Sequence, residues 1–366
     1  MTAAARLLGA WLACLVVLAL AVPVGLRAGT GVTALRFLVE FLSDGRRPWL
    51  SAVTAAPTRE TQRLGTGDLA DLWRPPGRGA RPGLVLVHGL TPAGKDDARL
   101  AWAAALLARG GLAVLVPDLP AMRAQRLRPD DARVVAAAIA RLAADPAVRP
   151  GRLAVVGVSV GLAPALLAAA EPAAGERARL VLSLGGHAEA RELIRYFTTG
   201  AYGAAGEGGR LAVDPGLARG FLTANLDLVR DPADRAAVAA WLAGGPAPAA
   251  VGAEGQAVLA LLTNRDPARV DALLAALSPD TRALLDALSP ARHAARFPGR
   301  LLLVHGREDP AVPFTESLRL LAASDPRRTR LVLVSLVGHV EGLGPAWSQL
   351  ADLARLWSVV YELFRG

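Results

Sequence analysis

Short apolar runs separated by helical stretches of ten or more residues fill two parts of the chain. Strands are predicted at residues 84–87, 113–116, 153–156, 180–184, 301–304 and 331–335. Helices are predicted at residues 98–109, 131–143, 162–170, 314–323 and 347–364. Strands that are apolar throughout are buried on both faces. The pattern therefore predicts an α/β fold with a mostly parallel sheet covered by helices on both sides, preceded by one or two edge strands within residues 61–73.

The segment from residue 186 to 291 breaks this alternation. Its predicted helices span residues 188–196, 234–242, 267–277 and 279–288. An all-helical segment of this length between two strands of an α/β sheet indicates a lid. We therefore expect the core in two parts, residues 61–185 and 292–366, with the helical lid insertion at residues 186–291 between them.

The beginning of the chain is strongly apolar. No charge occurs from Leu7 to Leu26, between Arg6 and Arg27. A helix of that length spans about 30 Å, the hydrocarbon thickness of a bilayer. Residues 1–30 are therefore predicted to form a transmembrane anchor, the alternative being a secretory signal that is cleaved near residues 19–21 and exports the protein. The excess of arginines after this run favours a cytoplasmic location for the rest of the chain, if the anchor is retained.

Residues 31–60 are predicted to form a short helix followed by a linker. Apolar side chains recur at helical spacing within residues 32–42, and residues 48–60 are rich in Pro, Ser, Thr and Ala. The helix either lies along a membrane interface or packs on the soluble domain.

Charge and cysteine content exclude several functions. The 366-residue chain has a formal net charge of +9, but Lys95 is the only lysine and the arginines are scattered. Without a long basic run or interleaved aromatic residues, we expect no nucleic-acid partner, and at most some attraction to anionic lipid. The only cysteine, Cys14, lies in the apolar run, so neither a disulfide within the chain nor thiol catalysis is expected.

The motif Gly157-Val158-Ser159-Val160-Gly161 lies between a predicted strand and a predicted helix. In this context Gly-x-Ser-x-Gly is typical of a nucleophile elbow, a sharp turn that exposes the serine hydroxyl at the carboxyl end of a strand. The two glycines are needed because the turn presses against neighbouring backbone. The N-terminus of the following helix favours negative charge that develops at the serine.

A serine nucleophile needs a base and an acid that holds the base. His339 follows the last predicted strand and is the candidate base. Asp309 follows the strand before it, in a loop that prolines at positions 310 and 313 stiffen, and is the candidate acid. Glu308 and Asp118 remain alternatives for the acid.

The other histidines are expected to play different parts. His88 and His305 each end a predicted strand, and we expect them to stabilise turns. His293 is expected to be structural. His187 lies at the entrance to the lid and could line the pocket.

The chain order Ser159, Asp309, His339 is that of α/β-hydrolases. With the segments His88-Gly89, Gly157 to Gly161, Gly306 to Pro313 and Gly338-His339, it makes the chain resemble the α/β-hydrolase superfamily, and more narrowly its bacterial dienelactone-hydrolase-like or serine-aminopeptidase-like members. The resemblance covers about residues 60–185 and 290–366. It implies that Ser159 is the nucleophile, Asp309 the orienting acid and His339 the base. It also implies an oxyanion hole made by the backbone N–H groups of Leu90 and Val160.

From these observations we expect a serine hydrolase that cleaves a carboxylic ester of a small-molecule acyl substrate through an acyl-enzyme. The lid is expected to roof an apolar acyl pocket with Tyr196, Phe197, Tyr202, Phe221 and Trp241. His187 and Tyr196 are expected to contact the substrate there. No metal or organic cofactor is expected, because neither ligand spacing nor a Gly-x-Gly-x-x-Gly motif is present. The alternatives are a peptidase or thioesterase of the same fold, or a non-catalytic membrane-tethered binding protein.

Overall fold

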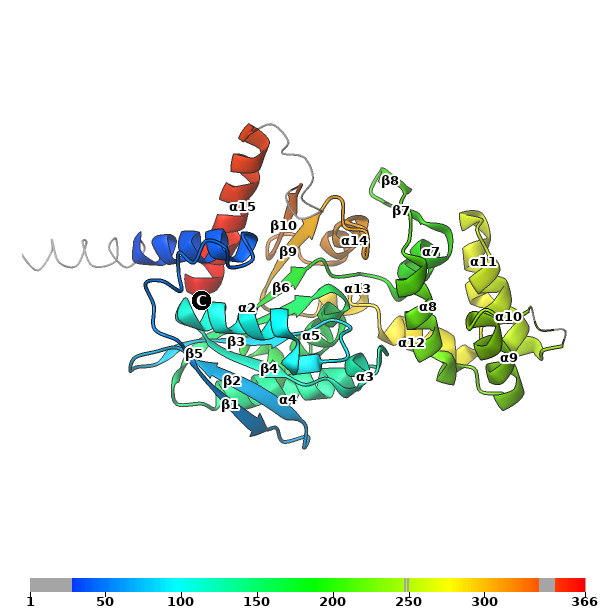
Figure 1. Ribbon diagram of the computed structural model, residues 1–366, viewed down its shortest axis with the longest axis horizontal. Helices are drawn as coiled ribbons and strands as arrows, with labels where there is room; N and C mark the ends of the chain where they lie inside the picture. Colours follow the sequence, from blue (N-terminus) through cyan, green and yellow to red (C-terminus); the bar gives the residue numbers. More distant parts are fainter. Residues whose placement is uncertain (1–27, 247, 249, 336–345, 366) are drawn as a thin grey trace, which may run out of the picture.

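An eight-stranded sheet forms the centre of the molecule (Figure 1). The computed structural model describes residues 28–246, 248, 250–335 and 346–365. The strands are β1 (Thr58–Arg63), β2 (Leu69–Arg74), β3 (Arg81–Val87), β4 (Ala113–Pro117), β5 (Val148–Val158), β6 (Ala178–Leu184), β9 (Arg300–Gly306) and β10 (Thr329–Val334), in the order β1-β2-β4-β3-β5-β6-β9-β10. Strand β2 is antiparallel to β1 and β4, and all other pairs are parallel. The prediction of a mostly parallel α/β sheet is confirmed.

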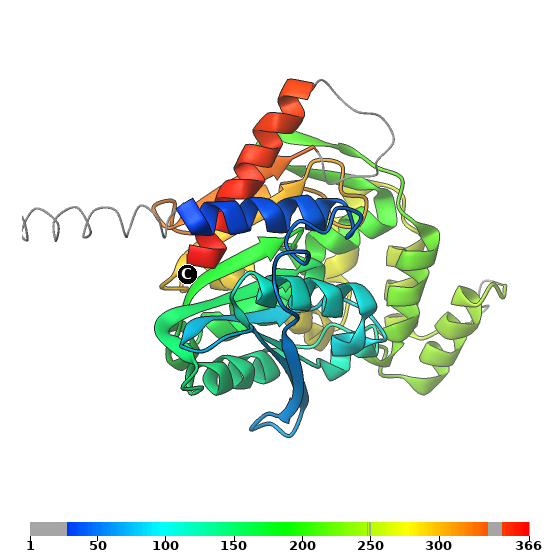
Figure 2. The ribbon, with the colours of Figure 1, turned by 60° about the vertical axis from the view of Figure 1, so that its left-hand side comes forward.

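Helices cover both faces of this sheet (Figures 1 and 2). Helices α4 (Asp131–Ala143), α5 (Leu162–Ala169) and α14 (Thr315–Ala323) pack on one face, and α2 (Ala98–Arg109), α15 (Ala346–Arg365) and a helix over residues 28–42 pack on the other. Within β3, Val85 and Val87 enter the first core while Leu84 and Leu86 enter the second. This alternation explains why the buried strands are apolar at every position.

Short helical segments connect these elements. They are α3 (Pro120–Arg123), α6 (Pro172–Gly175), α13 (Ala291–Ala294) and the 3₁₀ turns η1 (Gly94–Asp96), η2 (Ser159–Gly161), η3 (Leu226–Leu228) and η4 (Pro267–Arg269). The bounds of α2 and α4 agree with those predicted. Helix α2 starts where it does because the Asp97 carboxylate accepts the N–H groups of Arg99 and Leu100.

The insertion between β6 and β9 is helical except for one hairpin. Its helices are α7 (Ala190–Thr199), α8 (Pro215–Ala224), α9 (Pro232–Leu242), α10 (Ala253–Thr263), α11 (Val270–Ala275) and α12 (Pro279–Ala287). The hairpin joins β7 (Ala201–Ala204) to β8 (Glu207–Arg210), so the expectation of an all-helical insertion was wrong here. Ala205 and Gly206 form its two-residue loop with φ of 53° and 82°. Two consecutive positive φ angles match the twist of a tight hairpin, although the strands carry no alternating apolar pattern.

The helix over residues 28–42 packs on the domain. The indole of Trp357 in α15 donates to the carbonyl of Gly31 at 2.9 Å, and the Phe37 and Phe364 rings meet edge to face at 5.4 Å. The predicted membrane segment, Leu7 to Leu26, lies outside the described residues. Among the helices that the structure does describe, none combines the length and apolar character required to cross a bilayer.

Candidate active site

Ser159 lies on a strained turn between β5 and α5. Its φ is 52°, a left-handed value that is costly for any residue other than glycine. A Cβ atom at Gly157 would lie 2.6 Å from the Cα of Leu162, and one at Gly161 would lie 2.9 Å from the carbonyl carbon of His88. Neither position can hold a side chain without backbone movement. The predicted turn geometry, with glycine required on both sides of a half-buried serine, is confirmed.

The loop that follows β3 packs directly against this turn. A Cβ atom at Gly89 would lie 3.2 Å from the carbonyl oxygen of Val158 and 3.4 Å from the Cβ of Ser159. Leu90, the next residue, lines the same cavity as Val160. The two backbone positions predicted for an oxyanion hole therefore lie on two segments that meet at Ser159.

The imidazole of His88 holds this loop in place through two hydrogen bonds. Its buried imidazole accepts the backbone N–H of Leu119 at Nε2, over 3.2 Å, so the Nδ1–H donates to the carbonyl of Gly89 at 2.7 Å. Burial lowers the pKa of His88 below its usual value. A neutral imidazole with both nitrogens engaged stabilises the turn, as predicted, and is not available as a base.

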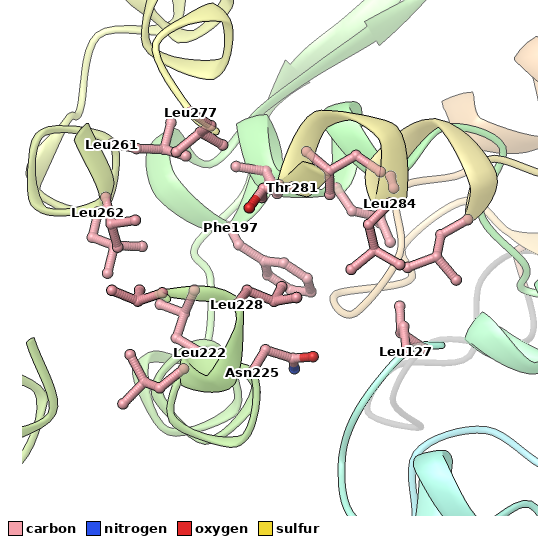
Figure 3. Close-up of a pocket in the computed structure, with 18 of the residues that line it drawn as sticks. Leu127, Phe197, Leu222, Asn225, Leu228, Leu261, Leu262, Leu277, Thr281 and Leu284 are labelled. Atoms are coloured by element: carbon pink, nitrogen blue, oxygen red, sulfur yellow. The ribbon is translucent and has the colours of Figure 1, made fainter. Parts of the chain in front are cut away.

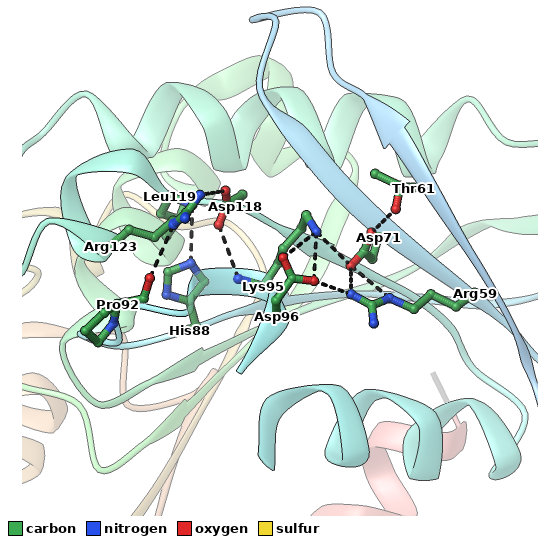
Figure 4. A network of polar contacts seen from close by, with 10 residues as sticks. All are labelled: Arg59, Thr61, Asp71, His88, Pro92, Lys95, Asp96, Asp118, Leu119 and Arg123. Carbon is green, nitrogen blue, oxygen red and sulfur yellow. Dashed lines mark hydrogen bonds and ion pairs between the residues drawn. The ribbon is translucent and has the colours of Figure 1, made fainter. Parts of the chain in front are cut away.

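A second polar network fixes the far end of the loop (Figure 4). The fully buried carboxylate of Asp71 on β2 accepts from Arg59, from the hydroxyl of Thr61 at 2.6 Å and from the ammonium of Lys95 at 3.3 Å. The backbone N–H of Lys95 also donates to Asp118 at 3.2 Å. Lys95 is thus a structural cation that ties the β3–α2 loop to β2. Asp118, an alternative acid in the sequence, is engaged in this network and in an ion pair with Arg123.

The candidate acid lies at the same edge of the sheet. Asp309 follows β9, and its Oδ1 accepts the N–H groups of Ala311 and Val312 at 2.8 and 3.0 Å. Its Oδ2 lies 3.0 Å from where a Cβ atom of Gly185 would be, just after β6. The loop is held by His305, which is buried, pairs with Ser317 at 2.7 Å and donates to the carbonyl of Val312 at 2.8 Å.

Two other titratable residues flank Asp309: His305, which is buried, and the alternative acid Glu308, which is exposed. Burial lowers the pKa of His305, although the nearby Asp309 acts in the opposite direction. Its hydrogen bonds support the turn-stabilising role predicted for it. Glu308 is exposed at the surface, whereas Asp309 is half-buried and oriented by backbone donors, which favours Asp309 as the acid.

The candidate base, His339, lies outside the described residues. Strand β10, which precedes it, pairs in parallel with β9, and Val334 at its end is in register with Gly306. The chain therefore leaves β10 at the carboxyl edge of the sheet, next to the loop that carries Asp309. This is the edge at which β5 presents Ser159.

An apolar cavity (Figure 3) reaches Val160, the residue after Ser159, although Ser159 itself does not line it. It has a volume of about 160 Å³, with Leu90 and Val160 on the core side and leucines, Ile194 and Phe197 from the insertion around the rest. Arg128 also lines it, but its guanidinium is paired with Asp227 and donates to Asn225, both at 2.8 Å. The cavity therefore offers an apolar lining with no unpaired charge.

The two residues predicted to contact substrate are not among those that line this cavity. The Tyr196 ring is buried and its hydroxyl donates to the carbonyl of Pro310 at 2.6 Å, so it fastens α7 to the loop of Asp309. His187 is fully buried, with Nε2 at 3.0 Å from the carbonyl oxygen of Leu288. Burial lowers the pKa of His187 to about 4, so this imidazole is neutral.

Sequence reasoning expected Phe197 at the pocket but missed Ile194 on the same face of α7. Ile194 and Phe197 line the cavity, whereas Tyr196, between them in sequence, points to the core. The apolar spacing of Leu193, Ile194 and Phe197 is the signal that could have identified this face. No group of three or more His, Cys, Asp or Glu side chains suited to hold a metal ion occurs in the described part of the chain.

Comparisons with known proteins give structural similarity only. No family model matches the chain, and no curated protein matches its sequence. Among solved structures, it is similar to 2,6-dihydroxy-pseudo-oxynicotine hydrolase, at 17% identity and TM-score 0.46, over 89% of this chain and 72% of that one. A puromycin-hydrolysing peptidase of Mycobacterium tuberculosis matches at 17% identity and TM-score 0.48, over 84% of this chain but only 39% of the peptidase. A hypothetical protein of Pseudomonas aeruginosa matches at 19% identity and TM-score 0.46, over 84% of this chain and 93% of that one.

The fold follows from features of the chain itself. A mostly parallel sheet carries a glycine-flanked serine on a strand-to-helix turn, and an aspartate follows a later strand at the same edge. An insertion separates these two parts of the core. These features together are those of a serine at the top of an α/β-hydrolase sheet. The chain has the fold of the α/β-hydrolase superfamily.

Proposed function

We propose that this protein is a serine hydrolase that cleaves the carboxylic ester bond of a small-molecule acyl substrate. The observation that carries the proposal is the backbone of Ser159, held at a φ of 52° one residue before Val160, which lines an apolar cavity together with Leu90. Strain of this kind costs about 1–3 kcal/mol and is typical of functional sites. In the proposed site this strain would present the hydroxyl of Ser159 to an acyl group bound in the cavity.

In the proposed reaction, the hydroxyl of Ser159 attacks the acyl carbonyl as the base removes its proton. The backbone N–H groups of Leu90 and Val160 stabilise the oxyanion, each contributing about 10²–10³ in rate. Helix α5 begins at Leu162, so its positive end lies at the same place. The alcohol leaves with the proton from the base, and water then releases the acid by the same steps in reverse.

His339 is the proposed base and Asp309 the carboxylate that orients it. The support for Asp309 is geometric: Oδ1 is held by two backbone N–H groups, whereas Oδ2 lies 3.7 Å from Nε2 of His305, beyond hydrogen-bond distance, and remains for the base. The support for His339 is its place in the sequence, five residues after Val334, where β10 ends next to the loop of Asp309. The carboxylate stabilises the imidazolium that forms during attack.

The cavity favours an uncharged, aliphatic acyl group. Nearly all of its lining is leucine, isoleucine, valine and phenylalanine, and the charge of Arg128 is already compensated. Burying a charged acyl group here would leave it without a partner, at a large cost in free energy. A thioesterase or peptidase would use the same serine and acid, so the leaving group has to be identified by assay.

The test compares hydrolysis of p-nitrophenyl esters with acyl chains of increasing length, together with thioester and aminoacyl substrates. Ser159→Ala is expected to reduce ester hydrolysis by at least about 10⁴-fold, and Asp309→Asn by about 10⁴-fold. Ser324→Ala, which removes a hydroxyl at the end of α14, is the matched control and should be fully active.

A fluorophosphonate probe distinguishes the remaining alternative. It should label the wild-type protein and the Ser324 variant but not Ser159→Ala. Folded wild-type protein that neither hydrolyses any substrate nor reacts with the probe would instead support a non-catalytic binding protein. Activity that survives in Ser159→Ala would overturn the proposed nucleophile.

A further inference from the structure

Most of the exposed apolar side chains of the described residues gather in one short segment. Eight large hydrophobic residues are exposed in the described part of the chain, and six of them fall within residues 32–53. They are Val32, Leu35, Phe41, Leu42, Trp49 and Val53, with exposed fractions from 36% to 57%. An exposed apolar patch of this kind marks an interaction site more often than scattered single residues do.

We call these six residues the N-terminal apolar surface. In the helix over residues 28–42, Val32, Leu35 and Leu42 lie at positions i, i+3 and i+10, on a face beside the buried one, since Leu42 follows the buried Leu38 by one turn. The apolar part of the helix is thus wider than the part that packs on the domain. A soluble helix normally carries polar residues on its outer face.

The segment with Trp49 and Val53 is folded back against this helix. The buried carboxylate of Glu40 accepts the N–H groups of Leu50 and Ser51 at 2.8 and 2.9 Å. The apolar side chains on both segments are therefore held in fixed positions by a buried polar contact. Tryptophan in such an exposed place is typical of membrane interfaces, where its ring has an apolar body and a polar N–H.

Three exposed arginines accompany the surface. Arg36, Arg46 and Arg47 form no ion pair with any described residue. An isologous contact with a second copy would bring these like charges towards one another, whereas anionic lipid headgroups would neutralise them. The residues immediately before the helix, Leu7 to Leu26, form the uncharged run of membrane-spanning length.

We propose that the N-terminal apolar surface lies flat on a bilayer that contains anionic lipid, with the arginines at the headgroups. Figure 1 places the helix over residues 28–42 at one end of the molecule and helices α9, α10 and α11 of the insertion at the other. The docked domain would therefore hold the insertion and its cavity away from the lipid, so that substrate enters from the aqueous side.

The test uses the full chain with Cys14→Ser, carrying a single cysteine labelled with an environment-sensitive fluorophore. Leu35→Cys and Val53→Cys report on the surface, and Ala268→Cys, exposed on the insertion, is the matched control. The proteins are reconstituted in vesicles of phosphatidylcholine with or without phosphatidylserine. Labels at 35 and 53 should brighten about three-fold and shift to the blue in the anionic vesicles, while the label at 268 should not change.

Charge variants make the inference sharper. Arg46→Gln with Arg47→Gln should shift the equilibrium by about 25-fold from the lipid-bound towards the released domain. Each arginine near an anionic surface contributes about five-fold to the binding constant. Labels at 35 and 53 that behave like the label at 268 in both kinds of vesicle would overturn the proposal. Blue-shifted emission without lipid would also overturn it. If that emission depends on protein concentration, a second copy covers the surface; if it does not, the N-terminal segment of the same chain covers it.

Discussion

Gly161→Ala is the substitution that tests most directly how the turn at Ser159 is built. Gly161 has φ −62° and ψ −14°, an ordinary right-handed conformation that alanine adopts without strain. The backbone dihedrals therefore give no reason for glycine at this position. The reason is space: the added Cβ would lie on the carbonyl group of His88, 2.9 Å from its carbon, and 3.0 Å from the carbonyl oxygen of Val87.

The size of the effect follows from these distances. Ordinary van der Waals contacts to a Cβ lie at 3.4–4 Å, so the end of β3 or the start of α5 must move by roughly 1 Å to accept the methyl group. Overpacking of this kind costs about 1–3 kcal/mol. The lower entropy of the unfolded alanine chain offsets about 0.4–1 kcal/mol of that. We expect a net loss of about 1–2 kcal/mol in the free energy of unfolding.

The same movement should impair catalysis. His88 comes two residues before Leu90, whose N–H is a proposed oxyanion donor. A displacement of about 1 Å at a catalytic group costs about 10²-fold in rate. We therefore expect kcat/KM of Gly161→Ala for a p-nitrophenyl ester to fall by about 100-fold, measured on protein shown to be folded by circular dichroism.

Urea unfolding measures the stability, with Gly65→Ala as the control. Gly65 lies in the turn between β1 and β2, and a Cβ there meets nothing within 4 Å. This variant should keep its activity and should be more stable by about 0.4–1 kcal/mol, from the lower entropy of its unfolded chain alone. If Gly161→Ala matched wild type in both measurements, the close approach of the two backbones would be refuted; if only stability fell, the placement of the oxyanion donor at Leu90 would be wrong.

Three further predictions concern buried and strained groups. Burial raises the pKa of Glu316 from 4.5 to about 7. Between these pH values the native state retains a proton that the unfolded state has lost. The free energy of unfolding should therefore fall by up to about 3 kcal/mol as pH rises from about 4.5 to about 7. Urea titrations at several pH values should show that Glu316→Gln removes this difference, and an unchanged pH profile would contradict it. Ser159→Gly should be inactive but more stable than Ser159→Ala by about 1 kcal/mol, because only glycine adopts a φ of 52° without cost; equal urea midpoints would argue against strain. Asp71→Ala should lose about 1–3 kcal/mol, because the hydroxyl of Thr61 and the buried ammonium of Lys95 each lose a charged acceptor, although Lys95 keeps its ion pair with Asp96. The exposed Glu60→Ala should change stability by less than about 0.5 kcal/mol.

Much of the core is evident in the order of residues. The run of apolar residues in each strand and the spacing of apolar residues in α2 and α4 reflect interactions between residues close in sequence. The positions of the strands and the bounds of these two helices could therefore be predicted. The turn at Ser159 could also be predicted, because its glycines and the flanking strand and helix are neighbours in sequence. The interpretation of His88 and His305 as turn-stabilising groups agrees with their hydrogen bonds.

The insertion shows where local pattern fails. Helix α10 was not predicted, since its alanines and leucines leave no clear polar face, and the β7–β8 hairpin depends on the backbone of Ala205 and Gly206. Tyr196 and His187 were assigned to the substrate pocket by their position after β6. The folded chain instead directs both into contacts with loops more than 100 residues away in sequence.

The sequence by itself therefore determined the α/β architecture and the identity of the candidate nucleophile and acid. Tertiary structure decided which face of α7 meets the cavity, which buried cation holds the β3–α2 loop, and which apolar side chains near the N-terminus stay exposed. The physical reason is that hydrophobic periodicity specifies that a residue is buried or exposed within its own element. The partner that it meets depends on contacts between segments far apart in sequence, which no local pattern contains.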